Sequence, residues 1–152
     1  MLIMTIYIDG DSCHKEARQI IIKRANKEGI SLWILADRSL AIDLSEYVHF
    51  DLIPSGEDAV DQAILDRITQ EDLVVTRDIP LAKKVLEKDV QVMNDRGVVF
   101  SEEFIKERLD QRNWTLQLKE AGLHTPGGKN YNQKNKQEFA NSFDKMIINL
   151  TK

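Results

Sequence analysis

Short apolar runs of strand length recur along the first two thirds of the chain. They are partly β-branched and are bounded by polar or turn-forming residues, which is typical of buried β-strands. We predict strands at residues 5–9, 31–36, 47–53, 73–76 and 90–93. Each of these runs is too short to form a helix of ordinary length.

Amphipathic segments separate most of these runs. Apolar residues recur with helical spacing at residues 14–28, 57–68 and 79–88, and Gly29 follows the first segment where a left-handed C-terminal residue is expected. Alternating strands and helices with right-handed crossovers favour a mostly parallel sheet of about five strands with helices on both faces. The predicted fold class is therefore α/β, with three α/β/α layers.

The pattern changes in the last third of the chain. Residues 101–121 carry a long, charged helical pattern, residues 122–130 read as a loop, and residues 133–150 are amphipathic. We interpret residues 101–152 as a helical tail appended to a core of about residues 1–100. A length of 152 residues fits one domain, residues 1–152.

Composition excludes several classes of protein. No apolar run reaches the roughly 18 residues that cross a bilayer, and the first residues lack the pattern of a signal peptide, so we expect a cytoplasmic protein without membrane contact. The lone Cys13 and the three histidines show no zinc-ligand spacing. A net charge of −4 and a pI near 5.4 argue against coating nucleic acid by bulk charge, although a local basic patch for RNA stays open, as does the oligomeric state.

Aspartates follow the predicted strands at the ends where parallel sheets bind ligands. The candidates fall into four clusters, which are Asp9 with Asp11, Asp58 with Asp61, Asp78, and Asp95. Carboxylates that converge raise one another's pKa unless a cation compensates, and hard ions such as Mg²⁺ or Mn²⁺ prefer oxygen ligands. The sequence therefore predicts a Mg²⁺ or Mn²⁺ site formed by these six residues.

Helix capping is the alternative explanation for several of these aspartates. Residues 55–58 resemble a capping box, and Asp11 or Asp78 could cap the helix that follows it. Asp9, which ends a buried strand, and Asp61, one turn from Asp58, are harder to explain in this way.

Basic residues near the acidic clusters are candidates for phosphate binding. Arg38, Arg77 and Arg96 stand beside these clusters, and Lys129 lies in the polar segment near residue 130. Arginine donors suit phosphate oxygens, but each arginine could equally pair with a neighbouring carboxylate.

Three motifs in order resemble the YaiI/YqxD family of uncharacterised bacterial proteins, which belongs among the PIN-like domains. They lie at residues 8–13 (IDGDSC), 56–61 (GEDAVD) and 76–82 (TRDIPLA), and weaker matches extend through the tail. PIN-like domains cleave RNA phosphodiesters with acidic residues that hold divalent ions. The resemblance implies a PIN-like fold, a metal-dependent ribonuclease activity, and catalytic roles for Asp9, Asp61 and Asp78.

Two other functions remain open. Residues 9–13 approximate the nucleophile motif of haloacid-dehalogenase-type phosphatases, in which Asp9 would attack phosphorus, although the late acidic motif of that superfamily is missing. A non-catalytic module that binds RNA or protein is the third possibility, because a fold does not guarantee its chemistry. For Cys13, a buried structural role is favoured over a reactive thiolate.

Overall fold

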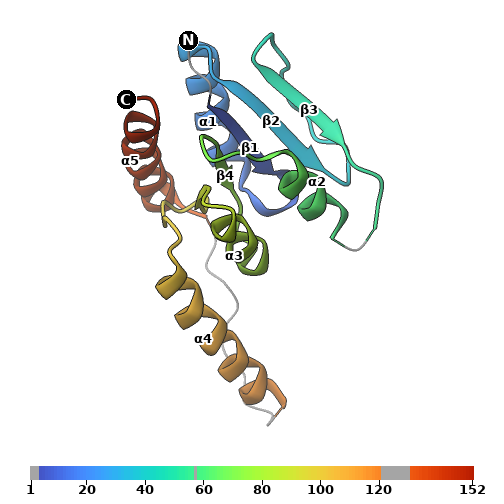
Figure 1. Ribbon diagram of the computed structural model, residues 1–152, viewed down its shortest axis with the longest axis vertical. Helices are drawn as coiled ribbons and strands as arrows, with labels where there is room; N and C mark the ends of the chain where they lie inside the picture. The colour runs from blue at the N-terminus through green and yellow to red at the C-terminus, as the bar shows by residue number, and fades with distance from the viewer. Residues whose placement is uncertain (1–3, 57, 121–130) are drawn as a thin grey trace.

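The structure is a computed structural model that describes residues 4–56, 58–120 and 131–152, with the backbone alone for residues 112–120. Its centre is a five-stranded sheet in which every strand pair is parallel (Figure 1). The strands are β1 (Thr5–Asp9), β2 (Ser31–Ala36), β3 (Val48–Leu52), β4 (Leu73–Val75) and β5 (Gln91–Met93). The predicted α/β class is confirmed.

The strand order β3-β2-β1-β4-β5 places β1 in the middle of the sheet. From β1 the chain first builds outward through β2 and β3, and then crosses to β4 on the other side of β1. The carboxyl ends of β1 and β4 therefore flank the topological switch point, where the chain stops adding strands on one side of β1 and starts adding them on the other. In open parallel sheets this is where ligands bind.

Helices cover both faces of the sheet. Side chains alternate between the two faces along each strand, so apolar residues on either face pack against a layer of helices. Ile6 and Ile8 pack in one hydrophobic cluster with α1 (Lys15–Glu28) and α5 (Gln133–Leu150). Tyr7 packs in the other cluster, with α2 (Ala59–Arg67) and α3 (Ile79–Glu87). The three predicted layers are present, and the predicted bounds of these elements differ from the observed ones by no more than two residues.

The two C-terminal helices differ in how they relate to the core. α4 (Glu102–Glu120) buries Ile105 near α3 and then runs away from the sheet (Figure 1). In contrast, α5 buries Phe139 and Phe143, whose rings stack 5.4 Å apart, in the same cluster as β1. The apolar face of α5 thus packs beside α1 in the layer on that face of the sheet.

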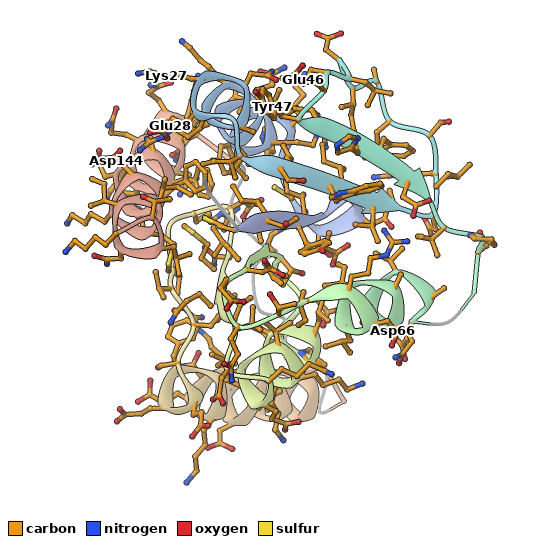
Figure 2. The ribbon with its side chains drawn as sticks, turned by 45° about the horizontal axis from the view of Figure 1, so that its top comes forward. Lys27, Glu28, Glu46, Tyr47, Asp66 and Asp144 are labelled. Carbon is orange, nitrogen blue, oxygen red and sulfur yellow. The ribbon has the colours of Figure 1, made fainter. Side chains whose placement is uncertain are left out.

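Charged side chains reinforce the contact between α1 and α5. Figure 2 shows Glu28 of α1 close to Asp144 of α5. Arg24 pairs with both carboxylates, and its Nη1 lies 2.7 Å from Asp144 Oδ1. Among the described helices, none is both long and apolar enough to span a membrane.

Candidate functional site

Asp9 is a buried carboxylate at the carboxyl end of β1. Its side chain is 3% exposed, and its Oδ2 accepts a hydrogen bond of 2.9 Å from the Thr76 hydroxyl. The Asp11 backbone N–H also donates to this carboxylate. Thr76 Oγ1 in turn accepts from the Asp78 backbone N–H at 3.0 Å. The ends of β1 and β4 are therefore joined through the Asp9 side chain.

Asp11 lies in the short 3₁₀ turn Gly10–Ser12 that follows β1. Its Oδ2 accepts from the Asp37 backbone N–H at 3.2 Å, and its Oδ1 is 3.4 Å from Arg38 Nε. Within the described part of the chain, Oδ1 is buried and accepts no hydrogen bond. The helix-capping alternative fails for Asp11, because His14 is the N-cap of α1.

Asp58, Asp61 and Asp78 come from the N-terminal ends of two helices. Asp58 precedes α2 in the left-handed conformation (φ 59°), and Asp61 lies in the first turn of α2. Asp78 caps α3, with Oδ1 accepting from the Leu81 N–H at 3.0 Å. The capping alternative is thus confirmed for Asp78, which uses one carboxylate oxygen for the cap and keeps the other for different contacts.

Carboxylates from separate parts of the chain converge on one open hollow of about 170 Å³, which we name the acidic hollow. The acidic residues that line it are Asp9, Asp11, Asp37, Asp58, Asp61 and Asp78. Five of these six were singled out from the sequence, and the carboxyl edge of the sheet brings them together.

The electrostatics of the acidic hollow reflect this convergence. The pKa of Asp9 is raised to about 6, mainly by burial and in part by nearby Asp11 and Asp78, with the Thr76 hydrogen bond opposing the rise. Burial likewise raises the pKa of Asp61 to about 6, with added contributions from Asp78, Asp9 and Asp58 and an opposing one from Lys84. At neutral pH the ionised carboxylates therefore destabilise one another.

The stability of the metal-free protein should consequently fall as pH rises through the weakly acidic range. Asp9 and Asp61 have pKa values near 6 when folded, against an ordinary value of 3.8, so the folded state binds protons more tightly than the unfolded state. The free energy of unfolding should drop by roughly 2 kcal/mol from about pH 5 to about pH 7.5, allowing for solvent screening at Asp61. Urea unfolding in EDTA measures this slope. The double variant Asp9→Asn/Asp61→Asn should be flatter, and an equal slope in both proteins would refute the assignment.

The donors in the acidic hollow suit a hydrated divalent cation. Within the described residues, no three His, Cys, Asp or Glu side chains are spaced to hold a metal ion by themselves. Mg²⁺ usually keeps several waters and binds through one or two carboxylates, so a complete protein cage is not required. The buried, unbonded Oδ1 of Asp11 and the raised pKa values of Asp9 and Asp61 are features that a cation would relieve.

Asp95 is not among the residues that line the acidic hollow. Met93 packs in the cluster on the α1 side of the sheet, and Asp95, two residues later, contacts that side as well. It is 1% exposed, and its Oδ2 accepts from the His14 N–H at 2.8 Å and lies 3.4 Å from Arg77 Nε. The structure thus separates Asp95 from the other predicted ligands, and its role in metal binding stays a prediction.

The predicted phosphate-binding residues are placed differently from one another. Arg77 lines a second, larger hollow beside the acidic one, and Arg38 is 70% exposed next to Asp11. Arg96 donates its backbone N–H to the Asn94 side chain and lines neither hollow. Lys129 lies outside the described residues.

Comparison with known families places the chain among its relatives. A family model described as "Uncharacterized BCR, YaiI/YqxD family" matches residues 7–149. The chain belongs to the YaiI/YqxD family. It is 36% identical to a "UPF0178 protein" of Syntrophotalea carbinolica over 95% of this chain and 97% of the relative. It is 35% identical to one of Desulfotalea psychrophila, over 97% of this chain and 99% of the relative.

The family membership predicted from the three motifs is thereby confirmed. No solved structure matches the chain, so the link to PIN-like domains stays a prediction. In this YaiI/YqxD member, each of the three motifs contributes at least one carboxylate to the acidic hollow.

Sequence reasoning missed four residues of the site. Thr76 holds Asp9, Asp37 lines the acidic hollow, and Ser12 and Lys84 line the larger one. Asp37 could have been found, because it directly follows β2 as the other candidates follow their strands. Lys84 lies inside α3, where a lysine gives no distinctive signal.

Cys13 shows no sign of reactivity. The side chain is buried, and burial, followed by the charge of Asp95, raises the pKa of its thiol. Its neighbour His14 caps α1 through Nδ1 and stacks on Tyr131 at 4.1 Å. Both observations favour the structural roles expected from the sequence.

Proposed function

We propose that this protein is a divalent-cation-dependent hydrolase that cleaves phosphodiesters at the acidic hollow. The observation that carries the proposal is the convergence of Asp9, Asp61 and Asp78 at the carboxyl ends of β1 and β4. Two of these carboxylates, Asp9 and Asp61, have pKa values raised to about 6 by burial and by neighbouring carboxylates. Perturbed carboxylates gathered in a hollow are a recognised sign of a functional site.

The residues of the acidic hollow would have different roles in binding the ion. Thr76 and the Asp11 N–H fix the orientation of the Asp9 carboxylate, which leaves Asp9 as the most rigid ligand. Asp61 and Asp78 would complete the set of ligands from α2 and α3. When bound, the ion supplies a water of lowered pKa and offsets the charge that builds on the phosphate.

Asp61 has a second role in this proposal. It is only partly buried, at the start of α2, and it lines the acidic hollow. Its pKa of about 6 belongs to the cation-free protein, and a bound cation would lower it. We therefore propose that Asp61 orients the attacking water, while the ion lowers the pKa of that water.

Purified protein should shorten an end-labelled single-stranded RNA in Mn²⁺ or Mg²⁺ and leave it intact in EDTA. The same samples should release no phosphate from p-nitrophenyl phosphate. Phosphate release together with a covalent aspartyl-phosphate at Asp9 would instead indicate the phosphatase chemistry suggested by residues 9–13. Binding of RNA without any cleavage would support the non-catalytic alternative.

A further inference from the structure

A larger hollow adjoins the acidic hollow and has a different charge character. Its volume is about 610 Å³, and it shares Ser12, Asp58, Asp61 and Asp78 with the acidic hollow. It adds two cationic side chains, Arg77 and Lys84, so we name it the mixed-charge hollow. A ligand that filled both hollows would meet carboxylates in both of them and cations in the mixed-charge hollow.

Arg77 is fixed at its backbone and at one side-chain atom. Its N–H donates to the Ser12 carbonyl at 3.1 Å, which anchors the start of the β4–α3 connection. Its side chain is 50% exposed, with Nε 3.4 Å from Asp95 Oδ2. Within the described residues this is the one ion pair of its guanidinium group, so the two terminal nitrogens keep their donors for a ligand.

Asp95 is the buried partner that holds Arg77. Its carboxylate accepts the His14 N–H, and its backbone carbonyl accepts the Tyr131 hydroxyl at 2.8 Å. These contacts fix Asp95 beside the Arg77 side chain, with its Oδ1 buried and accepting no hydrogen bond from any described residue. A buried carboxylate that contacts one edge of a guanidinium leaves the outer edge free to bind an anion in a fixed orientation.

Lys84 supplies the second cation of the mixed-charge hollow from the middle of α3. It is exposed, and it makes no ion pair with another described residue. Its charge reaches Asp61, since it lowers the pKa of that carboxyl. Lys83, its neighbour, lies instead in the apolar groove between α3 and α4.

We infer that the mixed-charge hollow binds a substrate phosphate next to the one that is cleaved, through Arg77 and Lys84, with Asp95 positioning Arg77. This inference rests on the proposed function and names the substrate class, a single-stranded nucleic acid. A monophosphate bound at the carboxylates would leave both cations without a phosphate to bind. A strand supplies a neighbouring phosphate for them, which suits a protein whose net charge of −4 gives no bulk attraction to nucleic acid.

Binding, measured apart from cleavage, tests this inference. A fluorescein-labelled oligouridylate of about ten nucleotides, a length within the usual site sizes, is titrated in Ca²⁺ and its anisotropy is followed. Arg77→Met and Lys84→Met should each weaken binding by about tenfold, the effect of losing one charge-assisted contact. Each should also lower the salt slope by about 0.7, while Lys83→Met stays within about twofold of wild type.

The positioning role of Asp95 has its own readout. Asp95→Asn should weaken binding in the wild-type background and have no further effect in Arg77→Met, because the two residues act through one contact. Arg77→Lys should recover part of the lost affinity. Equal losses from Asp95→Asn in both backgrounds would show a general structural effect and overturn the positioning role.

The outcomes separate this inference from the proposed function. If no oligonucleotide binds, or if Lys83→Met weakens binding as much as Lys84→Met, the phosphate subsite is wrong even where wild type cleaves RNA. If the predicted pattern of binding holds and no RNA is cleaved under any condition, the subsite stands and the hydrolase proposal fails.

Discussion

Asp9→Asn should melt higher than the wild-type protein in metal-free buffer at neutral pH and should respond less to Mn²⁺. A pKa raised from 3.8 to about 6 means that the ionised Asp9 carboxylate costs roughly 3 kcal/mol of stability at neutral pH. Weakening of its bond from Thr76 should cancel about 1 kcal/mol of the gain. The melting temperature should rise by roughly 4–8 °C, and the further rise that wild type shows in Mn²⁺ should shrink.

Asp66→Asn is the matched control for this variant. Asp66 lies on the exposed side of α2, as Figure 2 shows, and accepts a hydrogen bond from the Gln62 side chain. The substitution removes one carboxylate from the same helix as Asp61, and Asp66 lines neither hollow. Asp66→Asn should melt in Mn²⁺ as wild type does. A lower melting temperature for Asp9→Asn, with an unchanged response to Mn²⁺, would contradict the cation site.

Gly97→Ala should destabilise the protein strongly. Gly97 has φ near 90°, which side chains rarely adopt, and a Cβ added there would lie 2.6 Å from the Glu138 carbonyl oxygen. The turn after β5 would have to move away from the start of α5, which buries Phe139 in the core. We expect a loss of about 3 kcal/mol and a fall in melting temperature of roughly 6–12 °C.

Gly56→Ala is the control for the glycine substitution. Its φ is not positive, and among the described residues an added Cβ would come within 4 Å of Ala59 Cβ alone, at an ordinary 3.7 Å. This glycine-to-alanine substitution should therefore alter the melting temperature by less than about 2 °C, since it causes no backbone strain and no close contact. If both variants melted alike, the close packing of the β5 turn against α5 would be disproved.

The sequence was sufficient to predict the sheet and its layers but not the placement of α5. Strands such as residues 5–9 and 31–36 are marked by continuous apolar runs, because a central parallel strand is buried on both faces. The amphipathic pattern of residues 133–150 also predicts a helix with one buried face. It does not say which surface that face meets, because the cluster that holds Phe139 together with residues of β1 and α1 joins parts distant in the chain.

The acidic hollow was largely predictable for the same reason. Asp9 and Asp78 follow strands that end at one edge of the sheet, so convergence follows from topology alone. Asp95 also follows a strand at this edge, yet its side chain lies on the α1 side with Met93. The position after a strand predicts which edge of the sheet a residue occupies, but not the face toward which its side chain points. Lys84 lines the mixed-charge hollow because α3 packs beside α2, and this packing could not be predicted from the sequence.

The measurement that tests the central claim most directly is cleavage of an end-labelled single-stranded RNA in Mn²⁺ by wild type, Asp9→Asn and Asp66→Asn. All three proteins are first shown to be folded by their melting curves. We predict cleavage by wild type and Asp66→Asn, with a loss of at least about 100-fold in Asp9→Asn, because removing a metal ligand should cost no less than removing the outer-shell partner of a ligand. Cleavage by Asp9→Asn at the wild-type rate, or no cleavage by any of the three, would contradict a hydrolase centred on the acidic hollow.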